Sequence, residues 1–373
     1  TLTIQYVDTT PVTSTFDPAD RGFSVTTTEV GQFRYITATD SMKLPDRIEI
    51  PTSSAFIDSL TVENALAAGK IDISVVDENS DADTTGDLII GRIEAGGAST
   101  PSGQRALELH AAWSIYDLFT DTAAPIVNIT TTDPDGDVYL EAGEDIGRNG
   151  NFIDVTIAGE LTGTLGDDAF IHSVGDLYVG GTPLATANPR SFFESEDGNV
   201  TLDVDGTAHI GLIRAQGDGS TDSASELTDG VVKIDAEDSI VDRRNDTAAN
   251  IIATGAILNA GVDGGIGDIG TDGNPFETQV SRLEADVIGG GIWLDNDGHM
   301  QIGNISSQLG VRADETVDIS VAGDLTINEL VESEDSSAAT YVSLDATGDI
   351  VVNAGIISNS ADVTLDAGQD VLF

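Results

Sequence analysis

A short pattern of apolar and polar positions recurs along the chain and predicts strands separated by tight turns. Each copy begins with a small residue, almost always glycine, continues with one residue that is usually polar, and ends in two apolar residues that flank a third. Because successive side chains of a strand point to opposite faces, the two apolar residues predict a buried face. The glycine permits the turn, where Asp or Asn side chains can bond to the backbone. The ten copies are Gly69–Ile73, Gly86–Ile90, Gly136–Leu140, Gly175–Val179, Gly198–Leu202, Gly230–Ile234, Gly298–Ile302, Gly323–Ile327, Gly348–Val352 and Ala361–Leu365.

Strands this short are not stable alone, and their repetition predicts how they associate. Stacked on equivalent strands of the coils before and after, they form a parallel sheet with a continuous core of Val, Ile and Leu. We therefore predict an all-β, single-domain β-solenoid with coils of about 20–25 residues. The middle residue of each apolar triplet is expected to point outward, including Tyr139 and Tyr178.

A longer duplication supports a repeat protein. The dipeptide Ile146-Gly147 is followed by a similar dipeptide, Val179-Gly180, and Ile269-Gly270 is followed at the same spacing by Ile302-Gly303. The segment that starts at Ile146 and the segment that starts at Ile269 are the two modules of this duplication. When they are aligned from these dipeptides, similar residues fall opposite each other. Duplicated modules are typical of proteins built from stacked coils.

The repeats resemble those of a known family. The segments IGDIGTDGNPFETQVSRLEADV, GGGIWLDNDGHMQIG and YVSLDATGDIVVNAGIISNSADVTLDAGQDV are similar to the filamentous-haemagglutinin-type repeats of very large bacterial surface proteins. The resemblance is clearest over residues 130–373. It implies a right-handed parallel β-helix that is displayed outside the cell and acts in adhesion or as a surface fibre.

The pattern divides the chain into two regions. Residues 1–60 are less regular and rich in Thr and Pro, and they predict an irregular N-terminal strand or capping region. Residues 61–373 are predicted to form the parallel β-helix. Within it, Ala106–Leu118 is the best helix candidate, but its apolar residues share no face, so we predict a strand or a protruding loop.

Composition narrows the classes of function. The chain has 65 acidic and 15 basic residues, a formal net charge of −50 and no cysteine. Nucleic-acid binding is excluded because a phosphate backbone requires clustered Lys and Arg. Disulfides and thiolate metal sites are excluded, and no apolar stretch is long enough to span a membrane. Such acidity favours solubility at high salt or the binding of divalent cations, and both indicate an extracellular or saline setting.

Acid-rich turns are the candidate metal sites. Acids at Asp133, Asp135, Asp137 and Glu144 have the spacing of an EF-hand calcium loop, although Val138 stands where that loop needs glycine. Asp295 and Asp297 form a second candidate pair. Calcium is the predicted ligand because carboxylate oxygens suit it. The alternative is that these residues form solvated turns.

A solenoid of this type can also cleave polysaccharides. Asp167 and Asp168 resemble fragments of polygalacturonase motifs, but the order of the motifs differs and the basic Arg-x-Lys element is missing. Lyases of this fold need Arg or Lys to neutralise a uronate and abstract its proton, and the arginines here are scattered. We therefore predict that the chain is not an enzyme and assign no catalytic or cofactor-binding residues.

These observations predict an extracellular or cell-surface protein that is structural or adhesive. It would form a rod-like stalk or a self-assembling surface filament. The expected partners are further copies in a head-to-tail polymer, or neighbouring repeats of a longer chain, with surface glycans as a further candidate. The alternative function is a β-helix enzyme that binds or cleaves polysaccharide.

Overall fold

The computed structural model describes residues 87–95, 105–119, 125–134, 136–181, 192–217, 230–307, 310–335, 340–359 and 362–373. Before them it describes the backbone of β1 (Leu2–Val7), β2 (Thr26–Val30), β3 (Phe33–Ala38), β4 (Ile48–Thr52), β5 (Ser59–Ala67) and β6 (Ile71–Asp77). The chain divides into two compact units, Thr1–Val174 and Gly175–Phe373.

The first unit changes from antiparallel to parallel pairing along the chain. Strand β3 pairs antiparallel with β1 and β2, and β1 pairs antiparallel with β5. The parallel ladders begin with β4 on β6 and β5 on β7, and they continue through the rest of the unit. Those strands are β7 (Asp87–Ala95), β8 (Arg105–Ala111), β9 (Ile115–Asp117), β10 (Ile129–Thr131), β11 (Asp137–Ala142), β12 (Ile153–Ile157), β13 (Glu160–Leu165) and β14 (Ala169–Ser173).

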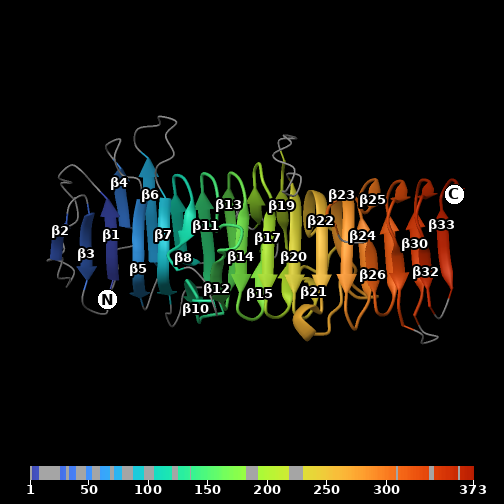
Figure 1. Ribbon diagram of the computed structural model, residues 1–373, viewed down its shortest axis with the longest axis horizontal. Helices are drawn as coiled ribbons and strands as arrows, with labels where there is room; N and C mark the ends of the chain where they lie inside the picture. The colour runs from blue at the N-terminus through green and yellow to red at the C-terminus, as the bar shows by residue number, and fades with distance from the viewer. Residues whose placement is uncertain are drawn as a thin grey trace. The chain divides into compact units, whose positions relative to one another are not determined.

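The second unit is a stack of parallel strands (yellow-green to red in Figure 1). It begins with β15 (Leu177–Val179), β16 (Phe193–Ser195), β17 (Val200–Val204), β18 (Ala208–Ile210), β19 (Ile213–Ala215), β20 (Val231–Ala236), β21 (Ile240–Asp242), β22 (Ile251–Ala260) and β23 (Phe276–Val287). It continues with β24 (Ile292–Asn296), β25 (Met300–Ile302), β26 (Val311–Ala313), β27 (Val317–Val321), β28 (Leu325–Ile327), β29 (Val331–Ser333), β30 (Val342–Ala346), β31 (Ile350–Val352), β32 (Ile356–Ser358), β33 (Val363–Ala367) and β34 (Val371–Leu372).

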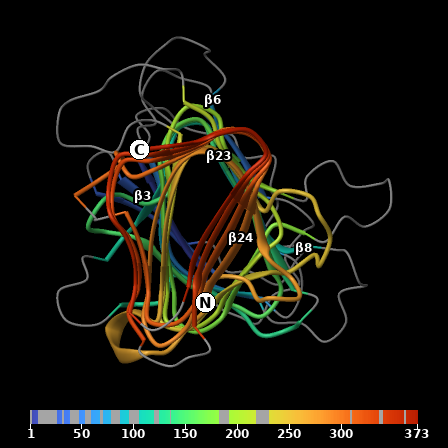
Figure 2. The same cartoon turned by 90° about the vertical axis from the view of Figure 1, so that its right-hand side faces the viewer.

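Each C-terminal coil contributes one strand to each of three ladders. One ladder contains β24, β27, β30 and β33, the next contains β25, β28, β31 and β34, and the third contains β26, β29 and β32. The pairing of Val317 with Val342 sets a coil length within the predicted range. Viewed along the stack, the last coils nearly superimpose as three-sided loops (red and orange in Figure 2). The prediction of an all-β solenoid is therefore confirmed.

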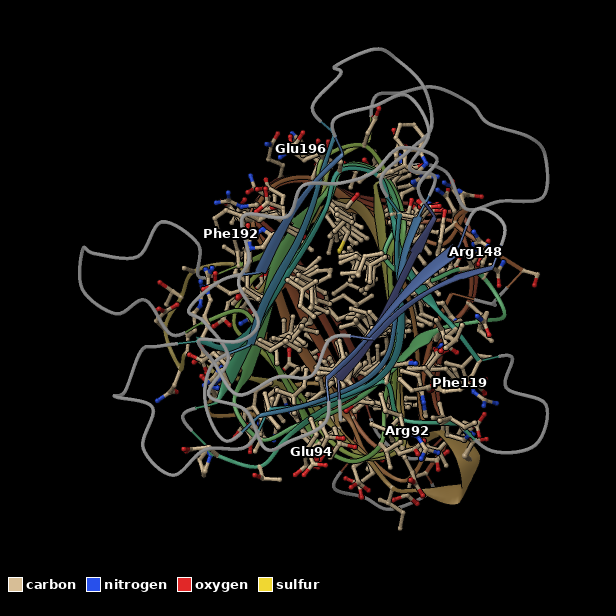
Figure 3. All side chains as sticks on the ribbon, turned by 90° about the vertical axis from the view of Figure 1, so that its left-hand side faces the viewer. Arg92, Glu94, Phe119, Arg148, Phe192 and Glu196 are labelled. Atoms are coloured by element: carbon tan, nitrogen blue, oxygen red, sulfur yellow. The ribbon has the colours of Figure 1, made fainter. Side chains whose placement is uncertain are left out.

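The core lies inside the coils and follows the predicted alternation. In β27, Val317 and Ile319 are fully buried and the Asp318 between them is only half-buried. Figure 3 shows the inward side chains as a dense carbon-rich filling, with oxygen and nitrogen atoms mostly outside. Tyr139 occupies an outer position as predicted, yet it is buried, because the Arg105 guanidinium lies 3.9 Å from the centre of its ring.

All ten copies of the short repeat coincide with strands, but they do not all occupy the same place in a coil. Gly298, Gly323 and Gly348 precede equivalent strands of one ladder, whereas the copy at Ala361 forms β33 in another. The repeat therefore marks a turn followed by a strand. Each C-terminal coil contains three such turn-and-strand segments. The segment Ala106–Leu118 forms β8 and β9, so the strand prediction is confirmed there.

The aspartate of the Gly-Asp pair joins one coil to the next. Asp324 accepts a hydrogen bond from the backbone N–H of Asp349 through Oδ1 at 2.9 Å, and Asp349 accepts one from Asp370 at 3.0 Å. In the first unit, Asp137, which follows Gly136, accepts the N–H of Glu160 at 3.0 Å, and Asp145, which follows Glu144, accepts the N–H of Asp168 at 3.3 Å. Some of the chain's acidic residues thus satisfy backbone groups that the parallel ladders leave unpaired at the turns.

Replacing Asp324 by alanine is expected to lower the free energy of unfolding by about 1 kcal/mol, because the N–H of Asp349 loses its partner. Urea unfolding measures the difference. The matched control is Asp345→Ala on β30, whose exposed side chain lies outside the turn, and its effect should stay within about 0.5 kcal/mol. Equal effects of the two substitutions would show that the turn hydrogen bond contributes nothing.

Candidate functional site

The residues of the EF-hand-like candidate lie in and beside the turn before β11. Asp137 begins β11, and its Oδ1 accepts the backbone N–H of Glu160 at 3.0 Å. The carbonyl of Asp133 accepts the N–H of Gly136, while Glu144 follows β11 and donates its N–H to the carbonyl of Trp113. Asp135 lies outside the described residues. Calcium binding here stays a prediction.

The second candidate pair lies on and after β24. Asp295 is on the outer side of the strand, between Glu277 of the preceding coil and Ser320 of the following one. Asp297 is in the turn after β24, and its backbone N–H bonds to the carbonyl of Thr278. In the part of the chain that the structure describes, no three acidic or histidine side chains gather as a group that could hold a metal.

Asp167 and Asp168, the residues compared with polysaccharide-cleaving enzymes, lie in the turn between β13 and β14. Their backbone N–H groups bond to the coil before, that of Asp167 to the carbonyl of Glu144 and that of Asp168 to Oδ1 of Asp145. Their observed backbone role is therefore to connect adjacent coils.

A buried polar network in the second unit is built around Asn250, just before β22. The amide nitrogen of Asn250 donates to the carbonyl of Ile210 at 2.8 Å and to Oδ1 of Asp242 at 2.6 Å. Its amide oxygen accepts the N–H of Glu277 at 3.0 Å. Asn250 is fully buried, and Asp242 and Glu277 are more than nine-tenths buried. One asparagine thus joins acids from β21 and β23.

The first unit contains the same network around Asn128. Its amide nitrogen donates to the carbonyl of Ile90 at 3.3 Å and to Oδ1 of Asp117 at 2.5 Å. Its amide oxygen accepts the N–H of Asp154 at 2.8 Å. The networks belong to the duplication found in the sequence, because Asp154 and Glu277 fall opposite each other when the two modules are aligned.

Sequence reasoning identified the duplication but not these residues. Asp117 and Asn128 precede the compared modules, as do Asp242 and Asn250. The signal in the sequence is the similarity of Ile115-Tyr-Asp117 to Ile240-Val-Asp242. An Asn-Ile dipeptide lies further along the chain in each case, at Asn128 and at Asn250. In a chain so rich in Asp and Asn, that similarity does not distinguish a buried pair from another solvated turn.

Each network leaves two carboxylate oxygens buried. Oδ2 of Asp117 and Oδ2 of Asp154 have no hydrogen-bond partner among the described residues, and the same holds for Oδ2 of Asp242 and Oε2 of Glu277. Burial raises the pKa of Asp117. It also raises the pKa of Glu277 to about 7, with a further contribution from the negative charge of Asp242. Both carboxyls are unusually easy to protonate.

The two networks differ in the residue on the next coil. His172 pairs with Asp154 in the first unit, and its Nδ1 lies 2.6 Å from Oδ1 of Asp154. The equivalent position in the second unit is Asp295, which pairs with Glu277. The first network therefore has a basic side chain where the second has another acid.

The strands β32, β33 and β34 form the last coil that the structure describes. Each of these strands pairs with the coil before, and no described strand pairs with its other side. Val342 in β30 is completely buried, whereas Val363, its partner in β33, is 42% exposed. Phe373 is 93% exposed.

The described residues contain no helix with the length and hydropathy needed to span a membrane. Comparisons with protein-family models, with curated protein sequences and with solved structures found no significant match.

Proposed function

We propose that the chain is an extracellular structural or adhesive protein whose coils stack in register to form a rod-like stalk or a filament. The observation that carries this proposal is the register of the ladders: Val317 pairs with Val342 and Val342 pairs with Val363, so successive coils place the same apolar residues over one another. An unpaired strand edge with apolar side chains is a template for another strand.

The partner that best fits such ladders is a further coil of the same kind, which a second copy of the chain would supply in a filament. Successive coils place aliphatic residues directly over one another, as Val317, Val342 and Val363 do in one ladder and Met300, Leu325, Ile350 and Val371 do in the next. A coil of the same kind would continue these ladders. The contact is heterologous, so it does not close and it generates a filament.

The surface properties of the chain are part of the same proposal. A net charge of −50 keeps an exported protein hydrated, but it also makes copies repel one another unless salt or cations screen the charge. Association with calcium, a right-handed coil and kinship with the filamentous-haemagglutinin type are proposed on the sequence patterns described above. Surface glycans are proposed as the ligands of an adhesive filament.

The test is electron microscopy combined with sedimentation of the purified chain at about 0.1 M and about 1 M salt, where the screening length falls from about 10 Å to about 3 Å. We expect filaments that lengthen with salt. Val363→Lys should abolish them, because it places a charge in the aliphatic ladder that Val317 and Val342 begin. Thr364→Lys is the matched control: it adds the same charge one residue away, on the outer side of β33, and should leave the filaments intact.

Circular dichroism and urea unfolding establish that both variants remain folded. Single particles of the wild-type chain under all salt conditions would overturn end-to-end assembly. Equal loss of filaments in the two lysine variants would show that any added charge matters and that this ladder is not the contact between copies.

A further inference from the structure

We infer that Asn149 is a site of spontaneous covalent modification, where the asparagine loses ammonia through a cyclic imide with Gly150 and becomes aspartate or isoaspartate. Water is the only co-reactant that this reaction needs. The inference is independent of the proposed stacking of coils from separate copies, because both residues lie in the turn before β12 of the first unit.

The turn that carries this pair is short and exposed. Arg148 and Asn151 close it with two backbone hydrogen bonds: the N–H of Arg148 donates to the carbonyl of Asn151 at 3.0 Å, and the N–H of Asn151 donates to the carbonyl of Arg148 at 2.9 Å. Asn149 and Gly150 form the tip, and both are exposed. The neighbouring Arg148 lies on the outside of the coils (Figure 3). Water therefore reaches the tip from the solvent.

The two groups that must react are free in the folded chain. The N–H of Gly150 donates to no acceptor among the described residues, and the side chain of Asn149 makes no hydrogen bond with them. Gly150 has a φ of 80°, and a Cβ built on it would have no heavy atom within 4 Å apart from its chain neighbours. Neither hydrogen bonding nor crowding therefore holds the amide away from the backbone nitrogen.

The reaction balances without an oxidant or a reductant. The backbone nitrogen of Gly150 gives up its proton and attacks Cγ of Asn149, a new N–C bond forms, and the side-chain nitrogen leaves as ammonia. Water then opens the cyclic imide at one of its two carbonyls. Breaking the new N–Cγ bond gives aspartate, and breaking the original peptide bond gives isoaspartate. Glycine suits the attacking position because it has no Cβ to crowd the ring.

No other asparagine of the chain is followed by glycine. Asn304 precedes Ile305, whose N–H is held by Oε1 of Glu284 at 2.7 Å, so the attacking nitrogen is occupied there. Asn353 is exposed, but it precedes an alanine, and its amide nitrogen donates to the side chain of Asn328 at 3.0 Å. Sequence and hydrogen bonding therefore both distinguish Asn149 from these two asparagines.

The duplicated turn of the second unit indicates that the aspartate product fits. Thr271 and Asn274 close that turn with the same pair of backbone hydrogen bonds, each 3.0 Å long. When the two modules are aligned, Asn149 falls opposite Asp272, which also precedes a glycine. The modification thus gives the first turn the acid that the second already has, and aspartate should leave the stability of the fold unchanged.

The isoaspartate product should affect the turn more strongly. It adds one methylene to the backbone between Arg148 and Asn151, so the two hydrogen bonds that close the turn cannot both keep their geometry. Both products add a negative charge next to Arg148, whose guanidinium lies 3.5 Å from the centre of the Tyr116 ring. The reaction therefore changes the charge of this surface and, in isoaspartate, also its backbone.

The experiment incubates the full folded chain in mildly alkaline buffer made with heavy-oxygen water and maps its peptides by mass spectrometry. The peptide with Asn149 should lose ammonia and gain one heavy oxygen about tenfold faster than the peptide with Asn353, a barrier lower by about 1.4 kcal/mol. Asn353 is the internal control because it is equally exposed but is hydrogen-bonded and precedes alanine. Enzymatic methylation of isoaspartate should label the product.

Two variants and an unfolded sample separate this site from general ageing of the chain. Asn149→Gln should abolish the mass change, because its longer side chain would have to form a larger ring. Asn149→Asp should unfold at the same urea concentration as the wild type. Conversion of Asn149 only in guanidinium chloride would overturn the inference, because the folded turn would then protect it. Equal rates at Asn149 and Asn353 would overturn it as well. Filaments are scored separately in the same samples, so the outcome for the proposed function is read independently.

Discussion

Asn250→Ala is expected to lower the free energy of unfolding by about 3–4 kcal/mol. The substitution removes the donor to Ile210 and Asp242 and the acceptor for the N–H of Glu277, all in a region without access to water. Each buried group that loses its partner costs about 1–3 kcal/mol, so the loss exceeds that of an ordinary surface hydrogen bond. Urea unfolding followed by circular dichroism measures it.

Asn353→Ala is the matched control. Asn353 follows β31 and donates to the side chain of Asn328 on the neighbouring coil at 3.0 Å, but this hydrogen bond is exposed and water replaces the lost partner. Its effect should stay below about 0.5–1 kcal/mol. If the two alanine variants were equally stable, the buried network would not be a structural element of the second unit.

Ile269→Ala should lower the free energy of unfolding by about 3 kcal/mol. Ile269 forms single bridges to Ile240 in the coil before and to Ile292 in the coil after, and all three side chains are fully buried. Alanine leaves a cavity between the neighbouring coils. The hydrogen-bonded ladders fix the spacing of these coils, so the cavity cannot collapse easily.

The control for this cavity lies on the same loop. Ile266 is 71% exposed, and its replacement by alanine should change stability by no more than about 0.5 kcal/mol. Both substitutions replace isoleucine by alanine, so the two variants differ only in how deeply the isoleucine is buried. A loss of stability at Ile269 as small as that at Ile266 would mean that inward aliphatic residues do not stabilise the stack.

The strands could be predicted from the sequence because their signal is local. The triplet Val317-Asp-Ile319 alternates in burial whatever its neighbours are, and the turn glycines lie where the chain changes direction. The ladder to which each strand belongs could not be predicted, because the strands of a C-terminal coil share one pattern. The copy at Ala361 looks like that at Gly348 in sequence but lies on a different side.

The buried networks could not be predicted for a different reason. Glu277 lies at an outer position of its strand, where a solvated carboxylate is the ordinary expectation, and only the packing of neighbouring coils buries it. The same applies to Tyr139 on β11, which is covered by Arg105 at the start of β8, the strand with which β11 pairs on the preceding coil. Periodicity indicates whether a side chain points inward or outward, but it does not show what covers the outer face.

The register of the C-terminal coils has a consequence for how such a chain can change length. Val317 pairs with Val342 and Ile292 pairs with Val317, and the turn aspartates repeat with the same 25-residue step from Asp324 to Asp349. Insertion of one residue into a strand would turn its aliphatic side chains to solvent, whereas insertion of a whole coil preserves both the ladders and the turn hydrogen bonds. Whole coils are therefore the increments in which this architecture can grow or shrink during evolution, and its reach can be adjusted without redesigning its interior.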